Sequence, residues 1–215
     1  MVKPVGAGRE RGPLAPLVEP VARRGVRRRA ASSRRVSVER VLDEPSVAMF
    51  YALYLTAFGP MRTRAAARHV LREDEFAADM TDPRVDKYVA WSSDGAPVGL
   101  TTLTNDLTAV PWISPEYFAA QFPEHTTRGA VYYLGFTLVD PRARGATVFH
   151  DMMAHVLQRL VAERAVVACD IAAYNNTVHS FDANLVAMLT ATAEVNVEVL
   201  DTQTYYAAGF TGPAA

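Results

Sequence analysis

An apolar run of ten residues, AVYYLGFTLV at 130–139, constrains the fold of this chain more than any other feature. Such a run is typical of a strand that is buried on both faces in the middle of a sheet. A short loop follows, and then apolar residues recur every four positions along one face of a predicted helix that ends near Arg164: Val148, Met152, Val156 and Leu160. A buried strand that runs into an amphipathic helix predicts a layered fold, with the helix packed on the sheet.

The residues before this strand predict two helices and three strands. Asp43 and Glu44 lead into Pro45, a favoured first helical residue, and Gly59-Pro60 ends this helix. A second helix is expected over 63–80, and Asp82-Pro83 stops it. Asp94-Gly95 indicates a tight hairpin turn. The three strands are expected at 34–42, where apolar and polar residues alternate, and on the two sides of this turn, at 85–91 and 96–104.

The C-terminal part predicts a strand at 166–174, a helix at 177–192 and a closing strand at 195–210. Residues 106–129 contain three prolines and several large aromatic residues without a clear period, so we interpret them as an insertion, part loop and part short helix. This order of elements predicts an α/β (α+β layered) fold. Its sheet is expected to be mixed and mostly antiparallel, with one parallel pair, and flanked by helices.

The whole-chain composition limits the class of protein. A length of 215 residues suits one domain with a substantial core. No apolar run reaches the roughly 18 residues that a membrane span needs, so we expect a soluble, cytoplasmic protein without a membrane partner. The single cysteine, Cys169, excludes an internal disulfide and a multi-cysteine zinc site, and its apolar surroundings place it in the predicted core.

The near-zero net charge hides an asymmetry. Residues 1–40 contain eleven Lys plus Arg against three Glu, a net of +8, whereas residues 41–215 have a net of −9. Residues 1–35 are rich in Pro, Gly and Arg and lack the apolar content that ordering requires, so we interpret them as a disordered basic arm. Such an arm either contacts nucleic acid or anionic lipid, or is a solvated tail or a misplaced start. We favour the second reading and expect no nucleic-acid partner.

The loop in TLVDPRARGATV, 137–148, is either a plain strand-to-helix connection or a cradle for an anionic ligand. The first N–H groups of a helix are not paired within it, and they attract anions. Small residues allow a ligand close to the backbone, and two arginines add positive charge. The residues concerned are Arg142, Ala143, Arg144, Gly145, Ala146 and Thr147.

Val139-Asp140-Pro141 followed by Arg142–Thr147 resembles the pyrophosphate loop of the GNAT superfamily of acyl-CoA-dependent N-acyltransferases. That loop has the form Arg/Gln-x-x-Gly-x-Gly/Ala after a Val-x-Pro strand end. Thr147 stands where the family has a last small residue, and the spacing from Pro141 is about two residues shorter than usual. The hairpin WSSDGAPVGLTTL resembles the family's second and third strands, and the order of elements agrees over about 36–210.

The resemblance implies an acyltransferase domain at 36–215. It implies acetyl-CoA, or another acyl-CoA, as co-substrate, with its pantetheine arm paired to the strand edge near Phe136–Val139. Acyl-CoA contacts are then expected at Leu138, Val139, Arg142, Ala143, Arg144, Gly145, Ala146 and Thr147. The implied activity is transfer of an acetyl or other short acyl group to a primary amine. The alternative is a GNAT-like domain that binds acyl-CoA, or a different ligand, without catalysis.

The family often places a tyrosine acid on the helix after the fifth strand, but 177–192 contains no tyrosine. Tyr174 and Tyr206 (or its neighbour Tyr205) are candidate substitutes by location, and a packed aromatic residue is the competing reading for each. One of Tyr132 and Tyr133 should face the acceptor side. His179, Ser180 and Asp182 are too close together on one helix for a hydrolase triad. The five-residue spacing of His150 and His155 does not suit a helical metal pair, so no metal is expected.

The acceptor is expected to be a small-molecule or peptide amine, bound by the insertion. Aromatic residues there would line an apolar pocket and two glutamates would attract a cationic amine: Trp112, Tyr117, Phe118, Phe122, Glu116 and Glu124. The competing interpretation is that these aromatic residues cover the sheet edge or form a contact in a homodimer.

Overall fold

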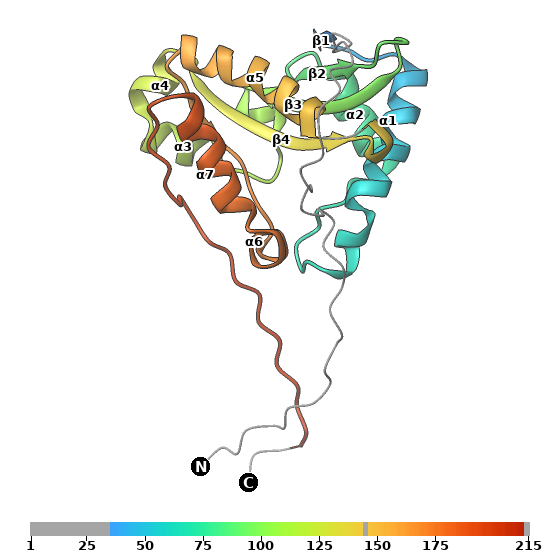
Figure 1. Ribbon diagram of the computed structural model, residues 1–215. Helices are drawn as coiled ribbons and strands as arrows, with labels where there is room; N and C mark the ends of the chain where they lie inside the picture. The colour runs from blue at the N-terminus through green and yellow to red at the C-terminus, as the bar shows by residue number, and fades with distance from the viewer. Residues whose placement is uncertain (1–34, 144–145, 213–215) are drawn as a thin grey trace, which may run out of the picture. The chain divides into compact units, whose positions relative to one another are not determined.

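The computed structural model describes residues 35–143 and 146–212, so the predicted basic arm lies outside the described residues apart from Arg35. Five strands form one sheet in the order of the chain (Figure 1). They are β1 (Arg35–Glu39), β2 (Asp86–Trp91), β3 (Pro97–Thr104), β4 (Val131–Val139) and β5 (Val166–Ala168). Neighbouring strands pair antiparallel except β4 and β5, which are parallel. The mixed, mostly antiparallel sheet of the predicted α/β fold is confirmed.

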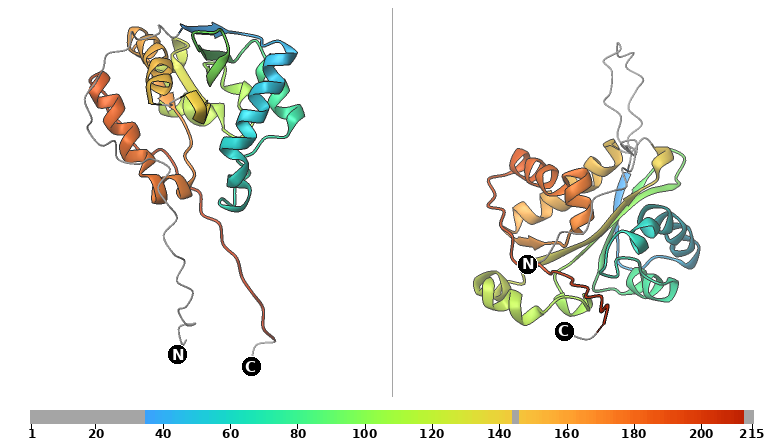
Figure 2. Two further views of the ribbon diagram at one scale, coloured as in Figure 1. Left: turned by 45° about the vertical axis from the view of Figure 1, so that its right-hand side comes forward. Right: turned by 90° about the horizontal axis from the view of Figure 1, so that it is seen from below.

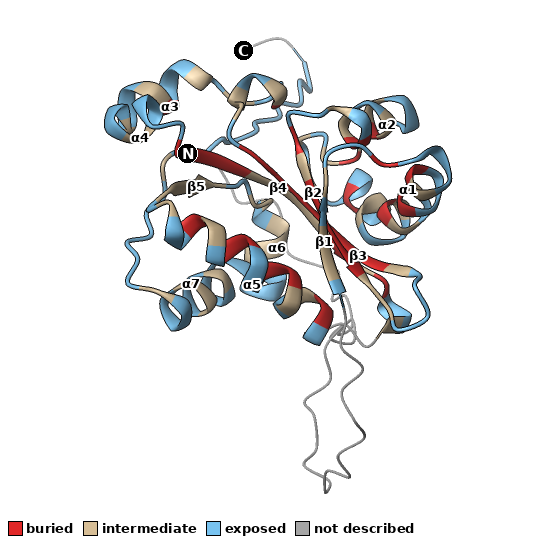
Figure 3. Cartoon of the chain, turned by 90° about the horizontal axis from the view of Figure 1, so that it is seen from above, coloured by how far each residue is buried: buried red, intermediate tan, exposed pale blue. Residues whose placement is uncertain are grey.

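Helices cover both faces of this sheet. They are α1 (Glu44–Phe58), α2 (Glu73–Thr81), α3 (Pro115–Gln121), α4 (Pro123–Thr127), α5 (Ala146–Ala162), α6 (Ala173–His179) and α7 (Phe181–Thr192). Helices α1 and α2 lie on one face and α5 on the other, while α3 and α4 lie beside the starts of β4 and β5 (Figures 2 and 3). Among the described helices, none combines the length and apolar character needed to cross a membrane.

Local signals in the sequence explain the first helix and the hairpin. The Asp43 carboxylate accepts the N–H of Ser46 at 2.9 Å and caps α1, whose first turn contains Pro45. Strands β2 and β3 are joined by a turn in which the N–H of Gly95 donates to the carbonyl of Ser92, with Gly95 at a φ of 82°. Both predictions are confirmed.

Two apolar layers hold the helices on the sheet because side chains alternate between its faces. On the face of α1 and α2, Phe50 and Phe76 pack with sheet residues and are fully buried. On the face of α5, Met153 and Val156 pack with other sheet residues. Alternation along β2 shows the division, because Val89 belongs to the first layer and Tyr88 to the second.

The predicted helix over 63–80 is wrong in its first half. A 3-10 helix occupies Gly59–Thr63, a loop follows over 64–72, and α2 begins only at Glu73. The Tyr54 hydroxyl donates to the carbonyl of His69 and accepts the N–H of Leu71, both at 3.0 Å. These tertiary hydrogen bonds replace helical ones, so the loop is fixed to α1.

The C-terminal predictions need three corrections. Strand β5 has only three residues, and the predicted helix over 177–192 is divided into α6 and α7 at Ser180, which has a φ of 48°. The closing strand over 195–210 is absent from the described sheet, where this segment makes no strand pairing. Cys169 is exposed rather than in the core, because the chain leaves the sheet at Ala168.

Candidate active site

The parallel strands β4 and β5 separate after a short pairing. Their register ends at Tyr133 opposite Ala168, whereas β4 continues to Val139, and no described strand pairs with this outer edge of 134–139. The N–H of Asp140 donates to the carbonyl of Val98 on β3 at 2.8 Å. Because peptide groups alternate along a strand, those of Thr137 and Val139 face away from β3. An extended ligand can therefore hydrogen-bond to this edge.

A β-bulge interrupts β4 within the open stretch. The register with β3 shifts between Thr101 and Leu103, so that Gly135 and Phe136 lie opposite the single residue Thr102. A Cβ atom at Gly135 would overlap the Thr102 hydroxyl oxygen, which explains the glycine. A bulge releases backbone groups from the ladder, and here it does so beside the point where β4 and β5 separate.

The residues expected to bind acyl-CoA lie at the end of β4, in the loop after it and at the start of α5. Leu138 is buried in the α1 layer, and Val139 packs with the α5 layer. Arg142 lies back on Asp140, whose pKa is lowered because Arg142 donates hydrogen bonds to its carboxylate. Ala143 ends a 3-10 turn and Ala146 begins α5, on which Thr147 is exposed. Arg144 and Gly145 lie outside the described residues.

A small pocket with a volume of about 20 Å³ lies beside the bulge, and Asp79 of α2 contributes to its lining. Its wall includes one carboxylate, and its lining residues are Asp79, Val85, Thr102, Leu103, Thr104, Ala109, Val110, Trp112, Tyr133, Gly135 and Phe136. Burial raises the pKa of Asp79 to about 6, against the opposing charge of Lys87. No hydrogen bond or ion pair joins this carboxylate to another described residue. Above about pH 6 this carboxylate is ionised, in a pocket that Gly135 and Phe136 of β4 also line.

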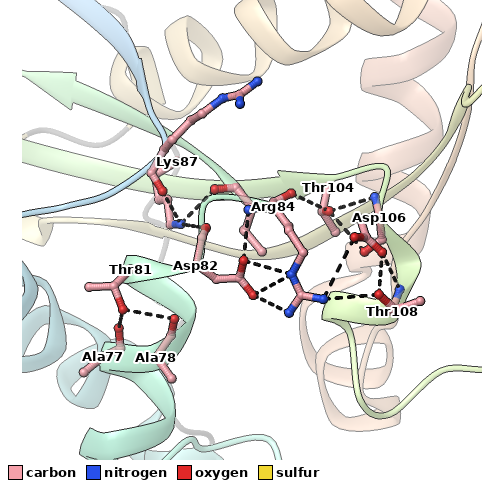
Figure 4. A network of polar contacts seen from close by, with 11 residues as sticks. Ala77, Ala78, Thr81, Asp82, Arg84, Lys87, Thr104, Asp106 and Thr108 are labelled. Carbon is pink, nitrogen blue, oxygen red and sulfur yellow. Dashed lines mark hydrogen bonds and ion pairs between the residues drawn. The ribbon is translucent and has the colours of Figure 1, made fainter.

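A polar network holds the walls of this pocket (Figure 4). The fully buried Lys87 ammonium donates to the backbone carbonyls of Arg40, Asp82 and Val85 at 2.6–2.9 Å. The Arg84 guanidinium binds the Asp82 carboxylate and donates to the Thr108 hydroxyl at 3.2 Å. The turn after α2 and the segment after β3 are thus fixed to each other.

A chain of polar contacts begins at two residues that line the pocket, Trp112 and Tyr133. The indole N–H of Trp112 donates to the Tyr133 hydroxyl at 3.1 Å, and this hydroxyl donates to the carboxylate of Asp170, just after β5. The Nδ1 atom of His69 lies 3.9 Å from the same carboxylate. Burial and the hydrogen bond to Asp170 raise the pKa of Tyr133 above its ordinary value, so it remains a neutral donor.

The two tyrosines chosen from the sequence are placed elsewhere. Tyr174 is a half-buried residue of α6, and the Arg64 guanidinium lies 5.1 Å from its ring centre. Tyr206 is 93% exposed on the C-terminal segment, where Tyr205 is also exposed. Neither lines the pocket beside the bulge. Their catalytic role stays a prediction.

The predicted acceptor residues divide into one pocket residue and several structural ones. Trp112 lines the pocket, whereas Phe118 is buried. The Tyr117 hydroxyl donates to the distant carbonyl of Leu200. The others are placed by neighbouring residues: Phe122 packs edge-on with His125, Glu116 accepts from the Ser114 hydroxyl and Glu124 lies in the first turn of α4.

Sequence reasoning missed Asp79, Asp170 and His69. A signal existed for Asp79, which lies between the buried residues Phe76 and Met80 of α2 and is thus an acid near an apolar helix face. Asp170 is a charged residue within the apolar run that predicted a strand over 166–174. For His69 there was none, because a tertiary hydrogen bond to its backbone places its loop.

Comparisons with known proteins find similarity only among solved structures. No family model matches the chain, and no curated protein sequence matches it. Among solved structures, an aminoglycoside acetyltransferase from an uncultured soil metagenomic sample, in complex with sisomicin, is 11% identical over 80% of this chain and 97% of its own, with a TM-score of 0.44.

Two further solved structures are similar. The ribosomal-protein-alanine N-acetyltransferase of Brucella melitensis biovar Abortus 2308 is 12% identical over 80% of this chain and all of its own, with a TM-score of 0.45. An acetyltransferase of Trypanosoma brucei is 15% identical over 81% of this chain and all of its own, with a TM-score of 0.41. These three solved structures are acetyltransferases, and their sequence identity to this chain is 11–15%.

Proposed function

We propose that this chain is a GNAT-type N-acyltransferase that moves an acetyl or other short acyl group from acyl-CoA to a primary amine. The observation that carries the proposal is the outer edge of β4 at 134–139, with which no described strand pairs and which has a bulge at its start and a helix N-terminus after its end. The peptide groups of Thr137 and Val139 suit the amides of a pantetheine arm. The loop at 142–147 suits its pyrophosphate.

The pocket residues supply the remaining chemistry. The amine nitrogen attacks the thioester carbon, and a backbone N–H released at the Gly135 bulge donates to the oxyanion. Asp79 accepts the proton that the amine loses. The carbon–sulfur bond then breaks, and the thiolate takes a proton from solvent. Tyr133 stays neutral and donates its hydroxyl hydrogen bond to Asp170.

Binding of acyl-CoA is tested by thermal denaturation in the presence of acetyl-CoA. We expect a rise in Tm that saturates with ligand and is lost in Gly145→Val, because a branched side chain blocks close approach to the backbone. Gly209→Val is the matched control, since nothing lies within 4 Å of a Cβ at that position. A wild-type protein without any shift at saturating acetyl-CoA would remove the acyltransferase proposal.

Catalysis by Asp79 is tested by release of free CoA during acetyl transfer. We expect kcat/KM to rise with pH through about 6, as the Asp79 carboxyl ionises. Asp79→Asn should lose this dependence and lower kcat by about 10²- to 10⁴-fold without changing the acetyl-CoA shift. An unchanged pH profile in Asp79→Asn would exclude this aspartate as the base.

A second candidate function is an acyl-CoA-binding domain without catalysis. The observation that favours it is the position of Tyr206, the tyrosine expected as acid, on an exposed segment that does not line the pocket. This function predicts the same acetyl-CoA shift but no CoA release with any amine.

A further inference from the structure

The loop over 64–72, with the end of the preceding 3-10 helix, forms a basic pocket next to the candidate active site. Four arginines occur between 62 and 72, with no acidic residue among them. The lining residues of the pocket are Arg62, Ala65, Ala66, Ala67, Arg68, His69, Val70, Leu71 and Arg72. Guanidinium groups bind carboxylates and phosphates in a bidentate manner, so this lining suits an anion.

This basic pocket has a fixed position relative to the bulge. Tyr54 is 2% exposed, and its hydroxyl holds the backbone of both His69 and Leu71 at 3.0 Å. The ring of Tyr54 also packs against Phe136, with 5.1 Å between the ring centres. Phe136 is one of the two residues at the bulge and lines the pocket of Asp79. This packing fixes the loop over 64–72 relative to the bulge in β4.

The two pockets also share one chain of polar side chains. Tyr133 lines the pocket of Asp79 and His69 lines the basic pocket. The Asp170 carboxylate accepts from the Tyr133 hydroxyl and lies 3.9 Å from Nδ1 of His69. The Asp170 side chain is 54% exposed, so this link lies at the surface between them.

Internal ion pairs leave part of the positive charge available. Arg68 and Arg72 both bind the Glu75 carboxylate. Arg62 is exposed, and no described carboxylate lies within ion-pair distance of it or of Arg64, which stacks on Tyr174. Arg62 is thus the arginine of this lining that can take a new anion without first losing a partner.

We propose that the acceptor is an amine that also carries a carboxylate or phosphate group, which binds in the basic pocket at Arg62. Its amine then reaches the pocket of Asp79 and Tyr133. This inference rests on the proposed acyl transfer and deepens it, because it sets the class of acceptor. In this proposal Arg62 recognises the acceptor through its anionic group. This differs from the expectation that Glu116 and Glu124 of the insertion attract a cationic amine.

Kinetics with matched acceptors test the inference. Each pair differs only in the anion: β-alanine against its amide, and O-phosphoethanolamine against ethanolamine. We expect kcat/KM to be about 10- to 100-fold higher for the anionic member of at least one pair, which also shows whether carboxylate or phosphate is preferred. Arg62→Gln should bring this ratio close to one, mainly through KM. Arg40→Gln, a change of equal charge at a 77% exposed arginine after β1, should leave the ratio unchanged.

A binding measurement keeps the test independent of turnover. Inorganic phosphate should raise the Tm of the wild type and of Arg40→Gln, and raise it less in Arg62→Gln. Neutral members acetylated as fast as anionic ones, or a phosphate shift of equal size in both variants, would overturn the inference while leaving acyl transfer intact. No shift with acetyl-CoA and no CoA release would instead remove the proposed function.

Discussion

At the scale of single residues, Asp79 couples the stability of the fold to pH. Its pKa is raised by burial from 3.8 to about 6, so the folded state binds a proton more tightly than the unfolded state between these values. The contribution of the Asp79 carboxyl to the free energy of unfolding is therefore most favourable below pH 4 and is lost as the pH rises through about 6.

Replacing this carboxyl by an amide should stabilise the protein at neutral pH. We expect Asp79→Asn to raise the free energy of unfolding at pH 7 by about 1 to 3 kcal/mol, since each pKa unit corresponds to about 1.4 kcal/mol. The difference from the wild type should disappear below pH 4. Urea titrations at pH 4 and 7 measure both values, and a variant less stable than the wild type at pH 7 would contradict the expectation.

Gly135 is the residue that the bulge requires. Gly135→Ala should lower the free energy of unfolding by about 1 to 3 kcal/mol, because its Cβ would overlap the Thr102 hydroxyl. In the background of Thr102→Ala, which removes that oxygen, the same change should cost clearly less. Equal losses in both backgrounds, measured by urea denaturation, would show that the overlap is not the cause.

At the scale of elements, Arg159 fastens α5 to the sheet. Its guanidinium binds the Asp86 carboxylate of β2 and lies 5.1 Å from the ring centre of Tyr132 on β4. The side chains of Arg159 and Asp86 are 33% and 17% exposed, so this ion pair is neither fully exposed to solvent nor fully buried. We expect Arg159→Met to lower the free energy of unfolding by about 1 to 2 kcal/mol. In a double-mutant cycle with Asp86→Asn, additive losses would contradict a direct coupling.

The insertion at 106–129 should show two separate effects. Trp112→Ala removes a wall of the Asp79 pocket and should raise the acceptor KM, with little change in acetyl-CoA affinity. Phe118→Ala removes a buried side chain, 8% exposed, and should lower the free energy of unfolding by about 3 kcal/mol or more. Steady-state kinetics and denaturation distinguish them. If both changes raise the acceptor KM to a similar extent, Phe118 lines the acceptor site as the sequence predicted.

At the scale of the whole molecule, the fold should not depend on the end of the chain. Every residue from 201 to 212 is exposed, and the Tyr117 hydroxyl contacts the segment at Leu200, before this stretch. A chain that ends at Leu200 should unfold within about 0.5 kcal/mol of the full-length protein and retain its kcat. If kcat falls while stability is kept, Tyr206 belongs to the reaction after all.

Strong local signals determined much of this fold. The cap at Asp43 and the Asp94-Gly95 turn specify α1 and the first hairpin, because these signals act between residues close in the sequence. The apolar run at 130–139 likewise placed β4 in the sheet, and the four-residue period after it placed α5. The amino-acid sequence by itself thus identified the layered fold and the strand that carries the candidate site.

Tertiary structure alone decided what surrounds that strand. The loop at 64–72 has helical composition, yet two hydrogen bonds between its backbone and the Tyr54 hydroxyl hold it in a non-helical conformation. In this conformation His69 lies next to Asp170. These two residues are about a hundred positions apart, and no periodicity in the sequence reports such a contact. The pocket of Asp79 depends on the same kind of distant packing. Periodicity records which face of an element is buried, whereas the position of a polar group in a site depends on which elements pack together.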